Sequence, residues 1–157
     1  GDCVRFTNLA PHLLVFAGRL KGMLSLTQEL TTQRELERAV GRALAEARHS
    51  SDAYAAATEL PADGSSKGRY VVLMELDRYP ADLAGLERQI DRGLCDENRV
   101  YKAHRAGNVA ILPPRIVCLD SGTFRRVLGL SNVQQKIPRI LTAVQRDRLL
   151  EEHQRMP

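Results

Sequence analysis

The side chains that most often carry catalysis are few in this chain and widely spaced. The three cysteines, Cys3, Cys95 and Cys118, form no C-x-x-C pair, so neither a disulfide framework nor a zinc knuckle is expected. The four histidines have no partner at i+3 or i+4, and no metal site is predicted. No Ser-His-Asp set, Cys-His set or carboxylate pair indicates a catalytic centre built by this chain alone.

Two lysine-containing loops are the remaining candidates for chemistry. Residues 64–68 look superficially like a phosphate-binding loop, but they lack the Walker spacing and fall between two strand-like runs, so a hairpin connection is the better interpretation. Lys136 stands in a polar loop just before Pro138. Because proline restricts the preceding residue to extended backbone, this loop can present Lys136 like a fixed finger. Taken alone, a loop lysine is most often a solvated surface charge.

Composition indicates one folded domain. The chain has 157 residues, of which 43% are hydrophobic and 27% charged, as is typical of a globular protein. The longest apolar runs, such as Leu13–Ala17, are too short to cross a bilayer, and no secretory leader is recognised. We therefore expect a cytoplasmic protein with no membrane partner.

The charge pattern does not favour nucleic acid as a partner. The formal charge is +4, but the basic residues are scattered among acidic ones and form no block. Only 4% of the residues are aromatic and none is tryptophan, so platforms for stacking bases are scarce. Nucleic-acid binding is therefore not expected.

Hydrophobic periodicity predicts the elements in the first third of the chain. Residues 1–16 are expected to form short strands around a turn, followed by a glycine-flanked joint at 18–22 and a short strand at 23–27. Thr32 and Glu35 fit a capping box, and the apolar face that follows predicts a helix through residue 47.

The rest of the chain alternates strands and helices. Residues 69–77 and 115–119 are predicted as buried strands, with Cys118 as a small buried hydrophobe. Residues 53–60 are ambiguous, since their alanines favour a helix and their position favours a strand. Further helices are expected after Pro80, at 96–106 before Gly107, from a Thr123 cap to Leu128, and at 142–154 with Val144, Leu149 and Leu150 inside.

This order of elements predicts an α+β fold. The expected architecture is a small, mostly antiparallel sheet with flanking helices, preceded by a short β segment.

Several segments, in this order and at these distances, are typical of one family. The most specific are G-T-F at 122–124 and Q-x-K-x-P-R at 134–139. They are accompanied by Gly1-Asp2-Cys3-Val4, Phe16-Ala17-Gly18-Arg19, Leu24-Ser25-Leu26, Asn98-x-x-Tyr101-x-x-x-Arg105-x-Gly107 and Pro114-x-x-Val117. The pattern resembles the C-terminal part of the acyl acid–amido synthetases of the Gretchen Hagen three family, especially bacterial members, in the adenylate-forming superfamily. The resemblance covers essentially the whole chain.

The resemblance implies an enzyme that activates a carboxylic acid with ATP and Mg²⁺. The acid becomes an acyl-adenylate, pyrophosphate leaves, and an amine then attacks to give an amide. ATP and Mg²⁺ would be bound mainly by a large N-terminal adenylation domain, the partner of this chain on the same or a separate polypeptide. Residues 1–18 would be a β-hairpin tail of that domain, and 19–157 the mobile C-terminal lid domain, with a hinge at 19–22.

The resemblance also implies roles for single residues. Lys136 matches the catalytic lysine of adenylation, and Gln135 is a possible support that orients it. Asp2 matches the aspartate that accepts hydrogen bonds from the nucleotide ribose. Arg19 lies in the hinge, between Gly18 and Gly22, and is a further nucleotide-binding candidate.

Tyr101 and Arg105 belong to a motif of the same family. They are spaced i, i+4 on one helix face, and they are possible supports with structural roles only.

A different class of function stays open at this point. The chain could be a stand-alone α+β interaction or regulatory module that keeps the fold without the chemistry. A Ser/Thr/Gly-rich phosphate loop encoded a few hundred residues upstream would favour the enzyme over the module.

Overall fold

A computed structural model describes residues 2–9, 12–19, 22–61, 67–132 and 134–155; only the backbone is described for 2–19. In chain order the elements are β1 (Asp2–Leu9), β2 (His12–Arg19), β3 (Met23–Leu24), β4 (Thr31–Thr32), α1 (Gln33–Glu46), β5 (Ala53–Glu59), β6 (Arg69–Glu75), α2 (Leu83–Glu97), α3 (Arg99–Arg105), the 3₁₀ helix η2 (Ala106–Asn108), β7 (Arg115–Leu119), α4 (Thr123–Leu128) and α5 (Ala143–Arg155).

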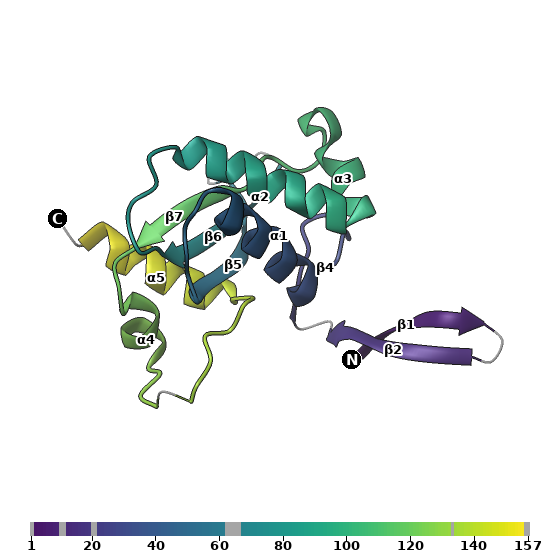
Figure 1. Cartoon of the computed structure of the whole chain (residues 1–157), viewed down its shortest axis with the longest axis horizontal. Helices are drawn as coiled ribbons and strands as arrows, with labels where there is room; N and C mark the ends of the chain where they lie inside the picture. Colours follow the sequence, from purple (N-terminus) through teal and green to yellow (C-terminus); the bar gives the residue numbers. More distant parts are fainter. Residues whose placement is uncertain (1, 10–11, 20–21, 62–66, 133, 156–157) are drawn as a thin grey trace.

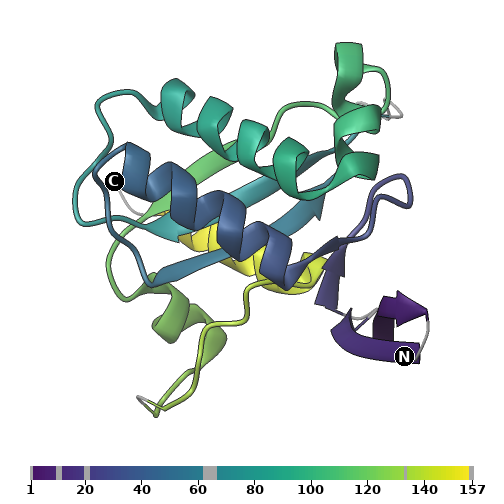
Figure 2. The same cartoon turned by 45° about the vertical axis from the view of Figure 1, so that its right-hand side comes forward.

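The body of the molecule has three layers. The central sheet has the strand order β5-β6-β7, with α1 and α2 on one face and α5 on the other (Figure 1). Figure 2 shows the same layers after a turn about the vertical axis, with α1 and α2 in front of the sheet and α5 behind it. The predicted α+β class with flanking helices is confirmed.

The strand pairing is mixed in the central sheet. β5 and β6 are antiparallel, whereas β6 and β7 are parallel and are joined through α2 and α3. The two small sheets, β1-β2 and β3-β4, are antiparallel, so β6-β7 is the exception among the strand pairs of the described residues. A parallel neighbour needs a helical crossover, which the α2–α3 segment supplies.

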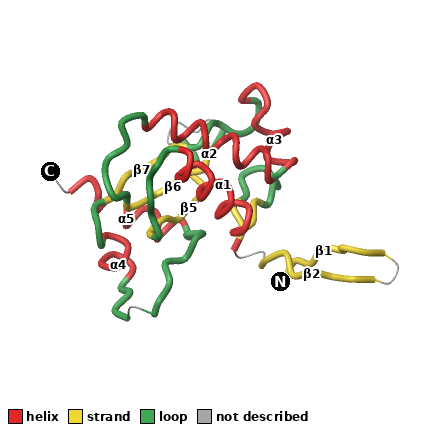
Figure 3. The backbone as a smooth tube through the Cα atoms, viewed as in Figure 1, coloured by secondary structure: helices red, strands yellow, loops and turns green. Residues whose placement is uncertain are grey.

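Both faces of the sheet are buried, because successive side chains on a strand point to opposite sides. On β6, Tyr70, Val72 and Met74 pack with α1 and α2, whereas Val71 and Leu73 pack with α4 and α5. The long apolar runs of β6 and β7 follow from this double burial. The backbone in Figure 3 shows the strands enclosed between the two helical layers.

The ambiguous residues 53–60 form strand β5. Tyr54, Ala55, Ala56 and Ala57 are all buried, and the alanines alternate between the two faces. Helix propensity is overridden here because pairing with β6 satisfies the backbone while both faces of the strand are covered.

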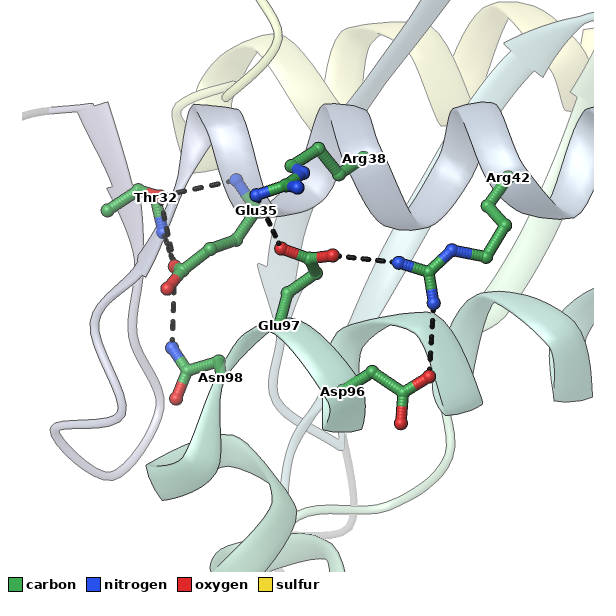
Figure 4. A network of polar contacts seen from close by, with 7 residues as sticks. All are labelled: Thr32, Glu35, Arg38, Arg42, Asp96, Glu97 and Asn98. Atoms are coloured by element: carbon green, nitrogen blue, oxygen red, sulfur yellow. Dashed lines mark hydrogen bonds and ion pairs between the residues drawn. The ribbon is translucent and has the colours of Figure 1, made fainter.

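Helix α1 begins as its sequence predicts. The Thr32 N–H donates to the Glu35 carboxylate at 2.7 Å, and the Glu35 N–H donates to the Thr32 hydroxyl at 3.3 Å. Polar side chains also join α1 to the end of α2: Arg42 donates to Asp96 and Glu97 at 3.1 and 2.8 Å (Figure 4). Helix α2 begins after Asp82, later than Pro80, because the Asp82 carboxylate caps Gly85 N–H at 2.7 Å.

The predictions for Thr123 and Val144 are wrong, and Cys118, predicted to be buried, is only partly buried. Thr123 is not the cap of α4; Gly122 takes that position with a φ of 81°, and the Glu75 carboxylate accepts from the N–H groups of Gly122 and Phe124, both at 2.8 Å. A carboxylate from a neighbouring strand thus replaces the local hydroxyl. Val144 is 69% exposed, whereas Leu149 is buried as predicted.

A buried carboxylate fixes the segment that leads into α1. Glu29 is 2% exposed, and its oxygens accept from the N–H groups of Leu26 and Thr27, both at 2.7 Å, and from the Tyr70 hydroxyl at 2.5 Å. The flanking residues Gln28 and Leu30 both have positive φ. The chain therefore accepts unfavourable backbone angles to place this carboxylate on the core.

Gly41 and Gly93 are a matched pair for testing how α1 packs on α2. A Cβ at Gly41 meets nothing within 4 Å, whereas one at Gly93 would lie 2.9 Å from the Ala39 Cα. Gly41→Ala is expected to raise the free energy of unfolding by about 0.5–1 kcal/mol, since alanine favours helix. Gly93→Ala is expected to lower it by about 1–2 kcal/mol, since the helices must separate. Urea unfolding measures both, and shifts of the same sign would contradict this packing.

Candidate functional site

Lys136 lies in the loop between α4 and α5, and the turn before it is held by hydrogen bonds. Helix α4 ends at Gly129 with a φ of 66°, which turns the chain away from the helix axis. The Gln135 N–H donates to the Asn132 carbonyl at 3.0 Å, and the Gln135 side-chain oxygen accepts from the Asn132 N–H at 3.3 Å. Gln135 thus stabilises the turn that precedes Lys136.

The chain after Lys136 joins the central sheet. The Ala56 N–H donates to the Arg139 carbonyl, and the Leu141 N–H donates to the Ala56 carbonyl, both at 2.8 Å. This is a parallel bridge along the outer edge of β5. Ile137 and Leu141 pack into the apolar cluster under α5, while Ile140 packs into the cluster under α1. The loop is therefore fixed on both sides of Lys136.

The Arg139 side chain adds further contacts at the same edge. Its guanidinium lies over the Tyr54 ring, 3.9 Å from the centroid. It donates to the carbonyls of Asp52 and Tyr54 at 3.0 and 2.9 Å and forms an ion pair of 3.4 Å with Glu37 on α1. Burial raises the pKa of Tyr54, and the nearby Arg139 charge partly offsets this effect.

A groove of about 650 Å³ runs beside this loop. Its lining comes from α1, the start of β5, α4 and the loop itself: Gln33, Glu37, Asp52, Ala53, Arg125, Gln135, Lys136, Ile137, Pro138 and Arg139. Lys136 is exposed, and its ammonium has no hydrogen bond or ion pair with any residue that the structure describes. An exposed ammonium without a partner among the described residues is free to pair with an anion that enters the groove.

The β1-β2 hairpin brings the N-terminal candidates Asp2 and Arg19 next to each other. Asp2 begins β1 and Arg19 ends β2, and the two residues are direct partners in the antiparallel hairpin, with Gly18 next to them. Gly22 follows in a short helical turn, while positions 20 and 21 of the predicted hinge lie outside the described residues. In both views the hairpin lies apart from the loop between α4 and α5 (Figures 1 and 2).

Tyr101 and Arg105 meet at a common carboxylate, away from Lys136. The Asp91 carboxylate accepts from the Tyr101 hydroxyl at 2.9 Å and from the Arg105 Nε and Nη2 at 2.8 and 2.6 Å. The Tyr101 ring also stacks on Tyr70 at a centroid distance of 5.2 Å. Desolvation and Asp91 raise the pKa of the Tyr101 hydroxyl, so it stays a proton donor. Helix α3 and the Lys136 loop lie at opposite ends of the body (Figure 1).

Sequence reasoning missed Glu37, Tyr54 and the side-chain role of Arg139. Glu37 reads as one of several exposed charges on α1, and Tyr54 as one apolar residue of an ambiguous segment. The one available signal was the place of Arg139 at the end of the Q-x-K-x-P-R motif.

One protein family matches most of the chain. The model of the GH3 family C-terminal domain matches residues 34–145. The chain belongs to the GH3 family. It is 30% identical over 156 residues to the indole-3-acetic acid-amido synthetase GH3.8 of Oryza sativa subsp. indica, covering 90% of this chain and 26% of the relative. The chain thus spans about a quarter of the length of this curated relative.

Two solved GH3 structures share the fold. A structure titled AtGH3.15 acyl acid amido synthetase in complex with 2,4-DB superimposes with a TM-score of 0.69 at 23% identity, covering 98% of this chain and 29% of that one. A second structure, GH3.15 acyl acid amido synthetase, gives a TM-score of 0.70 at 24% identity, with the same coverage. In the GH3 relatives, this domain is therefore one part of a longer synthetase.

The described residues contain no group of three or more His, Cys, Asp or Glu side chains that could hold a metal ion. None of their helices combines the length and the apolar character needed to span a membrane.

Arg105→Ala and Lys136→Ala compare the effect on stability of removing a largely buried, paired charge with that of removing an exposed one. The Arg105 and Asp91 side chains are only 12% and 18% exposed, so removing the arginine leaves a nearly buried carboxylate unpaired. The free energy of unfolding is expected to fall by about 3 kcal/mol. For Lys136→Ala the change is expected to stay within about 0.5 kcal/mol. Urea unfolding measures both, and a wild-type stability for Arg105→Ala would contradict the structural role.

Proposed function

We propose that this chain is the C-terminal domain of an ATP-dependent acyl acid–amido synthetase of the adenylate-forming type. In this proposal Lys136 is the catalytic cation of the first half-reaction, in which a carboxylic acid becomes an acyl-adenylate. One observation carries the proposal: Lys136 is an exposed cation without a partner among the described residues, on a loop fixed on both sides, in a GH3 C-terminal domain. The bacterial type expected from the sequence remains a prediction, since the rice relative is a plant protein.

Charge is the physical reason that this reaction needs a cation. The attacking carboxylate and the α-phosphate of ATP are both anionic, and pyrophosphate carries negative charge away as it leaves. An ammonium at about 4 Å from a phosphate oxygen contributes about 1 kcal/mol in water and about 4 kcal/mol near a protein surface. A cation positioned before the reaction begins acts without further reorganisation, which makes its effect on the rate large.

The described residues support only part of the proposed active site. The lining of the groove has three basic and two acidic side chains, so it suits an approaching phosphate better than a metal ion. Mg²⁺ would be bound mainly by the N-terminal adenylation domain, as the family resemblance implies. ATP, the acid and most of the nucleotide contacts belong to the N-terminal adenylation domain in this proposal.

The two half-reactions then require two placements of the domain. In the first, Lys136 faces the α-phosphate; in the second, the domain turns and leaves room for the amine. A turn of this kind needs a short segment that absorbs large changes in φ and ψ. We place it at residues 18–22, where Gly18 and Gly22 flank Arg19, and we assign Asp2 and Arg19 to the nucleotide side of the hinge.

Lys136→Ala in the full-length enzyme is expected to slow adenylation about 10²–10³-fold, since a preorganised cation is lost. ATP–pyrophosphate exchange with the acid measures this step. Formation of the amide from supplied acyl-adenylate is expected to fall much less, because no pyrophosphate has to leave. Lys102→Ala, which changes an exposed lysine on helix α3, is the matched control and is expected to leave both steps unchanged. An equal loss in both half-reactions for Lys136→Ala would remove its specific role.

The isolated chain is expected to show no ATP–pyrophosphate exchange with any carboxylic acid. The physical reason is that a single cation without an ATP loop and an acyl pocket cannot bring the acid and the nucleotide together. The exchange assay with the purified 157-residue chain is the measurement. Exchange above the protein-free background would contradict the assignment of ATP and acid binding to another domain.

A further inference from the structure

The side chain of Arg139, a loop residue, interacts with four other groups. Its guanidinium covers one aromatic face, donates to two carbonyl groups, and pairs with one carboxylate. These partners come from two separate parts of the chain: Glu37 belongs to α1, whereas Asp52 directly precedes β5 and Tyr54 lies near the start of β5. The Arg139 side chain is therefore a clamp between α1, β5 and the loop.

The clamp coincides with the point where the loop joins the sheet. The Arg139 carbonyl accepts from Ala56 N–H, and the Leu141 N–H donates to the Ala56 carbonyl, both at 2.8 Å. Side chain and backbone of the same residue thus hold the same strand. The Lys136 Cα is three residues away, which is at most about 10 Å of extended chain. A displacement of Arg139 relative to β5 would therefore also displace the Lys136 backbone.

We propose that Arg139 is a positioning residue for Lys136 in the adenylation half-reaction. It fixes the loop to β5 and α1, so that the Lys136 ammonium moves with the whole domain and not independently of it. This inference rests on the function proposed for Lys136. It assigns Arg139 no contact with the substrate, because its guanidinium is already engaged on Tyr54, two carbonyls and Glu37.

The chemistry of the clamp requires arginine. A guanidinium is planar, so its face can lie on the Tyr54 ring while its edge donates to carbonyl and carboxylate oxygens. A lysine ammonium is a point charge that cannot stack and donate in this way at the same time. Arg139→Lys is therefore expected to behave more like Arg139→Ala than like the wild type.

A double-mutant cycle in the full-length enzyme tests the inference. Arg139→Ala is expected to slow adenylation about 10–100-fold, the order of effect of misplacing a catalytic group by about 1 Å. Amide formation from supplied acyl-adenylate is expected to stay within about threefold of wild type. Adding Arg139→Ala to Lys136→Ala is expected to cost nothing further, because a residue that acts only through Lys136 has no effect once Lys136 is gone.

The control variant removes an arginine that has fewer partners and lies outside the groove. Arg78 donates to the Arg48 carbonyl at 2.9 Å and pairs with Asp77, but it lines no part of the groove. Arg78→Ala removes the same charge and is expected to leave adenylation unchanged. A loss equal to that of Arg139→Ala would show that the charge of the domain, and not the clamp, sets the rate.

Amide hydrogen exchange on the 157-residue chain reports the clamp without any activity. In Arg139→Ala, exchange at Leu141 and Ala56 is expected to accelerate at least about tenfold, while exchange at buried β6 residues such as Val72 stays unchanged. Unchanged exchange at Leu141 would overturn the clamp. Accelerated exchange throughout the core would show a general loss of stability instead of local positioning, and would overturn it too.

The outcomes distinguish this inference from the function on which it rests. If Lys136→Ala leaves adenylation intact, the proposed function fails whatever Arg139 does. If Lys136→Ala slows adenylation but Arg139→Ala does not, only the positioning role is overturned. Multiplicative losses in the double variant would likewise overturn it, since Arg139 would then act by a route of its own.

Discussion

Two backbone hydrogen bonds between Ala56 and the chain at 139–141 hold the site in place. They make the segment after the Lys136 loop an extra edge on β5, in the parallel sense. Without them, the connection from α4 to α5 would be tied to the sheet only through side chains. With them, a loop rich in polar residues ends at a defined place on a rigid sheet, which is the condition for presenting one side chain reproducibly.

The same edge shows why β5 has its unusual composition. Helices cover both faces of this strand, so small alanines alternate between the two apolar clusters. Tyr54 is the large exception, and its ring carries the Arg139 guanidinium. The same strand therefore serves packing and the anchoring of the loop: the residues that let two helical layers approach the sheet also provide the surface on which the loop is anchored.

Several regular elements could be predicted from local signals. The Thr32–Glu35 capping box and the apolar runs of β6 and β7 each depend on neighbouring residues, and the structure confirms them. Residues 53–60 could not be assigned, because burial on both faces is a tertiary property. The cap of α4 was assigned to Thr123, whereas a carboxylate distant in sequence, Glu75, supplies it.

The candidate site was likewise predictable only where its residues are neighbours in the sequence. The motif around Lys136 was recognisable from the sequence, because its residues are contiguous. Glu37 and Tyr54 were not, since they lie far from Arg139 along the chain and only the folded sheet brings them to it. The parallel pairing of β6 and β7 could not be predicted for the same reason, because it depends on how α2 and α3 cross over the sheet.

The proposed function depends on a positive charge at residue 136 during activation of the acid. The most direct test is chemical rescue of the full-length Lys136→Cys variant, with treated wild type as the control for Cys3, Cys95 and Cys118. Aminoethylation of the new thiol restores an amine of nearly the original length. The account predicts that adenylation, lost in the cysteine variant, recovers to at least about a tenth of the wild-type rate. If the aminoethylated protein activates the acid no faster than the unmodified variant, the charge at this position is not what the reaction needs.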